Sequence, residues 1–206
     1  MTLPDPPLLL VTDRRQALGS LADVLAAAFA GGCRWASLRE KDLPADEQVL
    51  LLQSLLPLAR AAGARLTLHG DAVLAQAAGA DGVHLGAGGD VAAARALLGP
   101  HALVGLSVHA GDDLAALDAG ALDYVVAGPA YPTESKPGYG PLLGPEGNAA
   151  LVRATSVPVI AIGGIDGANA RALCEAGAAG IAVMGGVMRA SDPAAEVRQL
   201  IAAVGR

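Results

Sequence analysis

The sequence predicts a single-domain (β/α)8 barrel. Short apolar runs alternate with Ala- and Leu-rich stretches of helical length, which is the pattern of a parallel sheet built from βαβ units. Eight such units fit in 206 residues, about 26 residues each, which is compact for this fold. A doubly wound open sheet is the alternative, but its glycine-rich turn after the first strand is replaced here by Thr12–Arg15. We expect one domain over residues 1–206, with residues 1–7 as an N-terminal extension.

The predicted strands are continuous apolar runs, as expected for strands that are buried on both faces. They are Leu8–Asp13, Trp35–Glu40, Arg65–Gly70, Gly82–Gly86, Leu103–His109, Tyr124–Ala130, Pro158–Ile165 and Gly180–Val187. The predicted helices that alternate with them are Gln16–Ala30, Asp46–Ala62, Ala72–Ala78, Asp90–Leu98, Gly111–Ala119, Pro145–Ala154, Gly167–Ala176 and Pro193–Val204.

Composition excludes several classes of protein. With 53% hydrophobic and 17% charged residues, the chain is not disordered as a whole. A net charge of −6 without any run of Lys or Arg argues against a nucleic-acid partner. Cys33 and Cys174 form no CxxC pair and are expected to be buried free thiols. Residues 1–7 resemble neither a signal peptide nor a membrane span, so we expect a cytoplasmic protein that does not contact membranes.

Two glycine pairs mark a predicted phosphate site. In a barrel, the residues at the C-terminal ends of the strands face the active site, and the loops after strands seven and eight often bind phosphate. Gly163-Gly164 and Gly185-Gly186 are expected to end these two strands. Because glycine has no side chain, backbone N–H groups there can approach an anion closely. The alternative is that both pairs only allow tight turns.

Further anion-binding groups follow strands two and six. Arg39 and Lys41 flank a glutamate at the end of strand two, where an Arg can bind a phosphate or carboxylate with two parallel hydrogen bonds. Thr133, Ser135 and Lys136 lie in the long loop after strand six, which is flanked by Pro and Gly and could cover a ligand. The alternatives are a solvated charge run and a flexible turn.

Strand five ends in a candidate acid/base. His109 follows Ser107 at the C-terminal end of this strand, and the ordinary pKa of His is close enough to neutral for proton transfer. His84 lies inside an apolar strand, so a structural role is favoured for it. His101 lies in a turn on the opposite face and is expected to be structural or solvated.

These motifs, in this order, resemble the thiamine phosphate synthase/TenI family over nearly the whole chain. The matching segments are Val11–Asp13, Leu38–Lys41, Gly79–Gly86, Gly105–His109, Asp123-Tyr124, Gly128–Thr133, Pro158–Ile165 and Gly177–Met184. The resemblance implies the same barrel fold. It also implies one of two activities. Synthases join a pyrimidine diphosphate to a thiazole phosphate with Mg²⁺, whereas TenI-type tautomerases aromatise a thiazole carboxylate phosphate with a His at strand five.

Departures from the synthase pattern fall on its metal and pyrimidine side. The family's two Mg²⁺ carboxylates correspond to Gly70 and Gly89, and glycine cannot ligate a metal. Asp71 or Asp90 could replace them only after a backbone shift of one residue. The synthase's Gln before Leu-Arg-Glu-Lys is Ser37 here. The glycine pairs on the thiazole phosphate side remain.

The resulting interpretation is a thiazole tautomerase that needs no cofactor. The glycine pairs would hold the phosphate of a small phosphorylated thiazole, Arg39 and Lys136 would neutralise its carboxylate, and His109 would move the proton. Two alternatives remain open: a synthase that uses Mg²⁺, for which the Thr133–Lys136 segment is the best argument, and a non-catalytic regulatory protein that binds a phosphorylated ligand. The resemblance also suggests a small homo-oligomer.

Overall fold

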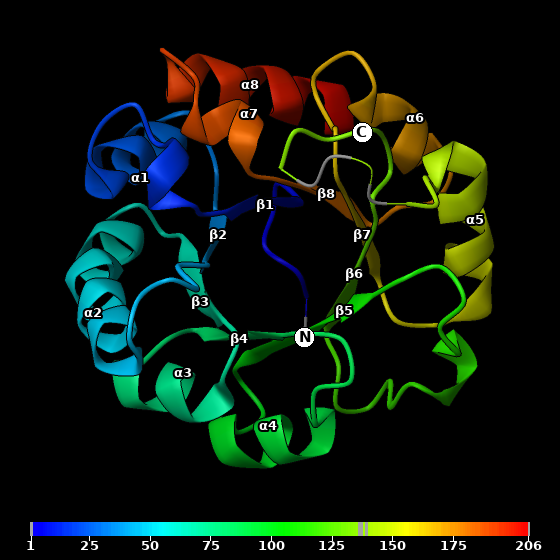
Figure 1. The fold of residues 1–206 in the computed structure, drawn as a ribbon, viewed down its shortest axis with the longest axis horizontal. Coiled ribbons are helices and arrows are strands. Elements are labelled where there is room, and N and C mark those ends of the chain that lie inside the picture. The colour runs from blue at the N-terminus through cyan, green and yellow to red at the C-terminus, as the bar shows by residue number, and fades with distance from the viewer. Residues whose placement is uncertain (1, 136–137, 139, 206) are drawn as a thin grey trace.

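A closed barrel of eight parallel strands forms the centre of the molecule (Figure 1). The computed structural model describes residues 2–135, 138 and 140–205. Each strand is hydrogen-bonded to its neighbour in the chain and β8 pairs with β1, which confirms the predicted (β/α)8 class. The strands are β1 (Leu8–Val11), β2 (Trp35–Leu38), β3 (Arg65–His69), β4 (Gly82–Leu85), β5 (Leu103–Val108), β6 (Tyr124–Ala127), β7 (Val159–Ile162) and β8 (Gly180–Val183).

The barrel is covered on its outside by helices. They are α1 (Leu21–Ala30), α2 (Ala45–Ala61), α3 (Ala72–Ala78), α4 (Val91–Leu98), α5 (Gly144–Ala154), α6 (Ala170–Glu175), α7 (Gly185–Met188) and α8 (Pro193–Val204), with two 3-10 turns, η1 (Arg14–Gln16) and η2 (Leu114–Ala116). Most of the predicted helices are present with shifted ends. The predicted helix Gln16–Ala30 begins later, at Leu21, because the Ser20 side chain caps it by accepting a hydrogen bond from the N–H of Asp23.

The predicted helix Gly111–Ala119 is wrong. Only the three-residue turn η2 forms there. The carboxylate of Asp113 accepts a hydrogen bond from the N–H of Ala115 at 3.2 Å, and that of Asp118 accepts one from Gly120 at 3.0 Å. Such local side-chain acceptors offer the backbone an alternative to a helix, and they hold this connection in turns.

Alternate residues of each strand point into the barrel. Six of the strands, all but β3 and β4, contribute to an apolar interior cluster whose members are Leu9, Val11, Trp35, Leu103, Tyr124, Val126, Ile160 and Ala182. The rings of Trp35 and Tyr124 meet edge to face, with centroids 4.6 Å apart. The Tyr124 ring lies over Gly105 so closely that a Cβ on that glycine would overlap the ring. Gly105 therefore makes room for the Tyr124 ring inside the barrel.

The described part of the N-terminal extension closes the end of the barrel where the strands begin. Leu3 packs against the interior cluster, and the carbonyl of Pro7 accepts a hydrogen bond from Ile181 at 3.0 Å. Figure 1 accordingly shows the segment before β1 lying across the centre of the barrel. This segment completes the core.

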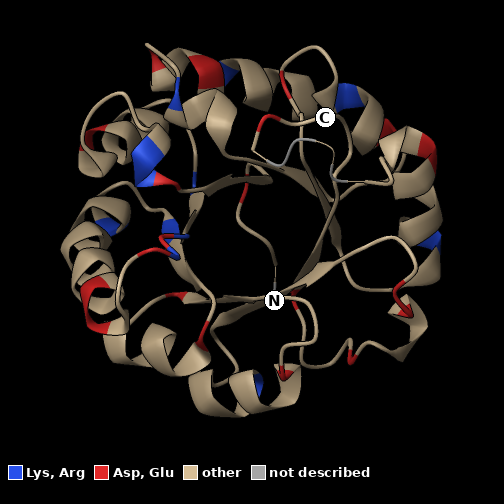
Figure 2. Ribbon diagram, viewed as in Figure 1, with Lys and Arg blue, Asp and Glu red and all other residues tan. Residues whose placement is uncertain are grey.

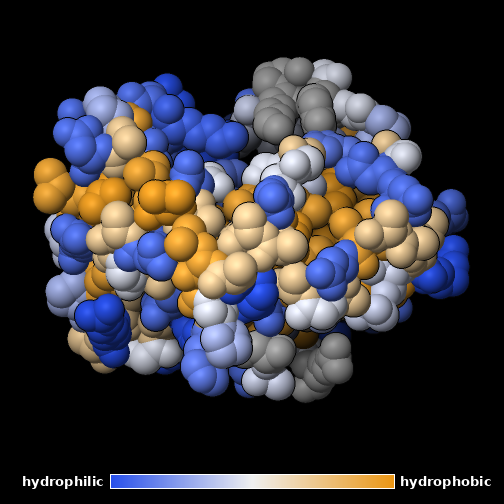
Figure 3. All heavy atoms as spheres, turned by 90° about the horizontal axis from the view of Figure 1, so that it is seen from below, coloured by the Kyte–Doolittle hydropathy of each residue, from blue (hydrophilic) through white to orange (hydrophobic). Residues whose placement is uncertain are grey.

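Charged and apolar side chains are both spread over the outside. Charged residues of both signs are scattered over helices and loops (Figure 2), and hydrophobic side chains lie among hydrophilic ones on the side shown in Figure 3. The large exposed aliphatic side chains of the described chain include Leu50, Val73 and Leu97, on α2, α3 and α4. Within the described residues, no helix has both the length and the apolar character required to cross a bilayer.

We expect Gly105→Ala to lower the free energy of unfolding by about 1–3 kcal/mol, because overpacking forces buried groups apart. Urea denaturation measures this loss. The matched control is Gly19→Ala, where an added Cβ meets nothing within 4 Å and the change should stay within about 0.5 kcal/mol. Equal stability of the two variants would contradict the close contact between Gly105 and Tyr124.

Candidate active site

One cavity of about 620 Å³ opens at the C-terminal ends of the strands. This volume suits a small organic ligand. The sequence predictions converge on it, since it is lined by Arg39, Lys41, Ser107, His109, Thr133, Ser135, Gly163, Gly164, Gly185 and Gly186. Lys136, also predicted to bind the substrate, lies outside the described residues.

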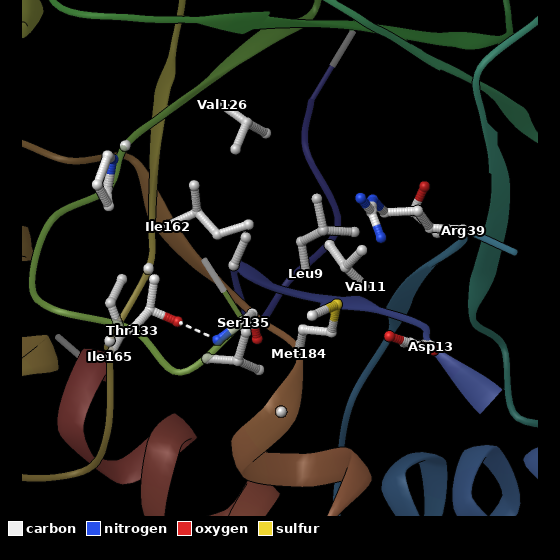
Figure 4. A pocket seen from close by; sticks show the side chains of 18 of the residues that line it. Leu9, Val11, Asp13, Arg39, Val126, Thr133, Ser135, Ile162, Ile165 and Met184 are labelled. Carbon is white, nitrogen blue, oxygen red and sulfur yellow. Dashed lines mark hydrogen bonds between the residues drawn. The ribbon is translucent and has the colours of Figure 1, made fainter. Parts of the chain in front are cut away.

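The lining of the cavity is polar on one side and apolar on the other. Strands β2 to β5 contribute the side chains of Ser37, His69, His84 and Ser107. The remaining strands, with the residue that follows β8, contribute Leu9, Val11, Val126, Ile162, Ala182 and Met184. In Figure 4, Arg39 enters from one side, opposite Thr133 and Ile165, with the apolar side chains between them. Such a lining suits a flat heterocycle with charged substituents.

A buried carboxylate fixes the end of strand β2. Glu40 accepts hydrogen bonds from the Thr12 hydroxyl at 2.6 Å and from the backbone N–H and guanidinium of Arg14, the latter at 3.1 Å. Arg14 also forms two hydrogen bonds of 2.8 Å to Asp42, and the backbone N–H of Arg39 donates to the Thr12 hydroxyl. The glutamate between the two predicted anion-binding residues therefore anchors the loop that carries Arg39.

The loop after β7 packs closely against the loop after β6. Gly163 and Gly164 have φ values of +102° and +63°, a region that favours glycine, and a Cβ on Gly164 would lie 2.8 Å from that of Tyr131. The Asn169 side chain donates a hydrogen bond to the Gly164 carbonyl at 2.9 Å. Both glycines are thus required by the turn itself and also leave the backbone open toward the cavity.

Gly185 and Gly186 begin a helix, where the sequence predicted the end of a strand. Strand β8 stops at Val183 and α7 begins at Gly185, so the predicted strand Gly180–Val187 is too long. Its apolar residues continue into α7 because both elements are buried, and hydrophobicity alone does not separate them.

Arg189, which the sequence reasoning missed, lies at the cavity directly after α7. Its guanidinium contacts Gly185, donates to Gln16 and donates at 2.9 Å to Glu134. The signal was a basic residue one helical turn after the second glycine pair.

His84 belongs to a buried chain of polar side chains. Its Nδ1 lies 3.2 Å from the Tyr124 hydroxyl and its Nε2 lies 2.9 Å from the Ser107 hydroxyl. Burial, assisted by the charge of Lys41, lowers the pKa of His84 to about 3, so the ring is neutral near neutral pH. Burial raises the pKa of Tyr124. If the Tyr124 hydroxyl donates to Nδ1, then Nε2–H donates to Ser107, whose own hydroxyl hydrogen can point into the cavity.

His109 lies at the mouth of the cavity on the loop after β5. Its backbone N–H donates to Asp112 Oδ2 at 2.7 Å, and its ring Nδ1 is 3.8 Å from the same oxygen. The ring is about one-third exposed, with 37% of its side-chain surface accessible. A carboxylate beside the imidazole is a common partner of a histidine that acts as an acid/base.

The residues present do not fit the Mg²⁺ site that the family resemblance implies for a synthase. Gly70 has a φ of +142°, which disfavours any side chain, and a Cβ on Gly89 would lie 2.8 Å from that of Leu85. Asp71 and Asp90 cap α3 and α4 by accepting hydrogen bonds from backbone N–H groups. Neither of them lines the 620 Å³ cavity.

The carboxylates that line the 620 Å³ cavity already accept hydrogen bonds from other groups of the protein. Asp13 bonds Arg15 and Gln16, Glu134 bonds Arg189, and Asp166 accepts from two backbone N–H groups. Among the described residues, no three His, Cys, Asp or Glu side chains are grouped so that they could hold a metal ion.

Comparisons with known proteins agree with the barrel fold and identify the family. Residues 8–187 match the family described as thiamine monophosphate synthase. The chain is 43% identical over 198 residues to a thiamine-phosphate synthase of Roseiflexus sp. RS-1, with 94% of this chain and 83% of that protein covered. It is 41% identical over 189 residues to a thiamine-phosphate synthase of Laribacter hongkongensis, with 91% and 89% covered.

A solved structure shows the same likeness in three dimensions. The thiamine phosphate pyrophosphorylase of Pyrococcus furiosus superposes with a TM-score of 0.83 at 31% identity, covering 96% of this chain and 94% of that one. The match of the family over most of the chain, together with these relatives, establishes that the chain belongs to the thiamine phosphate synthase/TenI family.

Proposed function

We propose that this family member is a thiazole tautomerase, which aromatises a thiazole carboxylate phosphate by moving one proton. The observation that carries the proposal is the backbone at Gly70 and Gly89. A carboxylate cannot be placed at either position without strain or displacement of a neighbour, while His109 lines the 620 Å³ cavity and lies beside Asp112. Diphosphate departure needs a hard cation and its oxygen ligands. Tautomerisation needs only a group that accepts and returns a proton.

His109 is the better of the two candidate histidines for proton transfer. His84 is fully enclosed, both of its ring nitrogens have partners, and its lowered pKa makes it a weak base. His109 is partly exposed and lines the cavity. A positioned acid/base of this kind contributes about 10²–10⁴-fold to a rate. His84 then acts by holding Ser107 at the cavity wall.

The proposed substrate fits the distribution of charge and hydrophobicity in the cavity. The four glycines leave room for a phosphate at one end, and the apolar side chains can contact the ring. Arg39 would pair with the carboxylate from the opposite side, and Lys136 remains a predicted second partner. No prosthetic group or metal enters this proposal.

The second candidate is the Mg²⁺-dependent synthase. The names of the relatives favour it, and Thr133 and Ser135 line the cavity as the synthase alternative requires. It predicts thiamine phosphate formation from the pyrimidine diphosphate and the thiazole phosphate. A regulatory protein without catalysis predicts ligand binding without turnover.

We expect the purified protein to accelerate conversion of the non-aromatic thiazole carboxylate phosphate into its aromatic isomer equally well in EDTA and in Mg²⁺. The change in ultraviolet absorbance on aromatisation follows the reaction, and the coupling reaction is assayed in parallel with Mg²⁺. Isomerisation that fails, or coupling that proceeds with Mg²⁺ while isomerisation does not, would contradict the tautomerase assignment.

His109→Asn should lower the isomerisation rate about 10²–10⁴-fold, because asparagine keeps a polar group but cannot take up the proton. His101→Asn is the matched control, since His101 is exposed in a turn and away from the cavity. Steady-state rates of the two variants measure the difference. Equal rates would remove His109 from the chemistry.

His84 should make folding sensitive to acid. The ordinary pKa of an exposed His is about 6.5, and the folded value is about 3. Between these pH values the unfolded chain therefore binds more protons, and the unfolding free energy falls as pH falls, by up to about 1.4 kcal/mol per pH unit. In urea denaturation between about pH 3 and about pH 6.5, the window set by these two values, His84→Gln should show a shallower decline than wild type. A parallel decline would show that His84 does not titrate as described.

A further inference from the structure

Arg189 joins three segments at the glycine end of the cavity. It follows α7, while its guanidinium donates to Gln16 at the end of η1 and to Glu134 in the loop after β6. All three residues line the cavity. The contact therefore connects the phosphate end of the proposed site to the loop that Thr133 and Ser135 occupy.

The guanidinium lies directly against Gly185. A Cβ on this glycine would be 2.8 Å from both Cζ and Nη2 of Arg189. The other described basic side chains that line the cavity are Arg15, Arg39 and Lys41. A Cβ added to any of the four glycines of the two pairs would have none of these three side chains among its nearest neighbours. Arg39 enters from the side opposite Thr133 (Figure 4), and Arg15 is paired with Asp13 at 3.3 Å.

The ion pair between Arg189 and Glu134 is weak enough for a phosphate to replace Glu134 as the partner of Arg189. The side chains retain 42% and 83% of their accessible surface, so water screens their attraction. A phosphate carries more charge than a carboxylate and can accept two parallel hydrogen bonds from a guanidinium. A phosphate group beside Gly185 would therefore compete effectively with Glu134 for the same donors.

We propose that Arg189 is the charged ligand of the substrate phosphate and that phosphate binding displaces Glu134 from it. This inference rests on the proposed phosphate site at the glycine pairs, and it does not depend on which reaction follows. Glu134 holds the guanidinium over Gly185 before the ligand arrives. Its release then frees the loop after β6 from Arg189, so occupancy of the phosphate site is coupled to the position of Thr133 and Ser135.

Calorimetric titration with three probes tests the proposal: thiazole phosphate, the corresponding thiazole alcohol and inorganic phosphate. Arg189→Gln should weaken binding of thiazole phosphate about 10- to 100-fold and leave the alcohol unchanged, because only the phosphate loses its charge-assisted hydrogen bonds. Arg198→Gln is the matched control, because Arg198 is exposed on α8 and does not line the cavity.

Glu134→Gln tests the exchange. If Glu134 competes with phosphate, its neutralisation should tighten binding of both phosphate probes about two- to fivefold. Weaker binding in this variant would overturn the exchange, and equal losses for the phosphate and the alcohol in Arg189→Gln would overturn the role of Arg189. If only inorganic phosphate binds wild type, and Arg189→Gln abolishes it, Arg189 is supported while the thiazole substrate is wrong. Wild type that binds neither phosphate probe would refute both.

Discussion

Closure of the parallel barrel is the constraint on which the rest of the structure depends. Each strand is paired on both sides, so all eight strands must end at the same rim. Side chains alternate between the helices and the interior, which places Leu66 and Leu68 in the outer core but His69 at the cavity. Residues that are distant in the chain, such as Arg39 and Gly185, consequently meet around one ligand-sized space.

The interior of the barrel also determines how the site is built. The Tyr124 ring crosses over Gly105, meets Trp35 at its edge and reaches His84, which in turn bonds Ser107 at the cavity. Packing in the apolar layer is therefore linked to the position of a polar group that faces the ligand. Because the His84 side chain is buried, desolvation keeps it neutral near neutral pH, and we propose the partly exposed His109 for proton transfer.

Much of this arrangement could be predicted from the sequence. Apolar runs located all eight strands, since strands buried on both faces are mostly apolar, and the polar residues that follow them identified most of the cavity lining. The connection at Gly111–Ala119 was mispredicted because aspartates that cap turns compete with a helix. Arg189 was missed because its position one turn after the second glycine pair is only a weak signal, and its contacts with Gln16 and Glu134 join segments that are distant in the sequence.

The central claim is that glycine at two rim positions has removed the binding site for a divalent ion while the space for a phosphorylated thiazole remains. The backbone supports it, since Gly70 has a positive φ and Gly89 is crowded by Leu85. The most direct measurement is anomalous diffraction from crystals soaked with Mn²⁺ and diphosphate, with Mn²⁺ replacing Mg²⁺. The account predicts no manganese peak beside Gly70 and Gly89. A peak coordinated there by Asp71 or Asp90 together with diphosphate would contradict it.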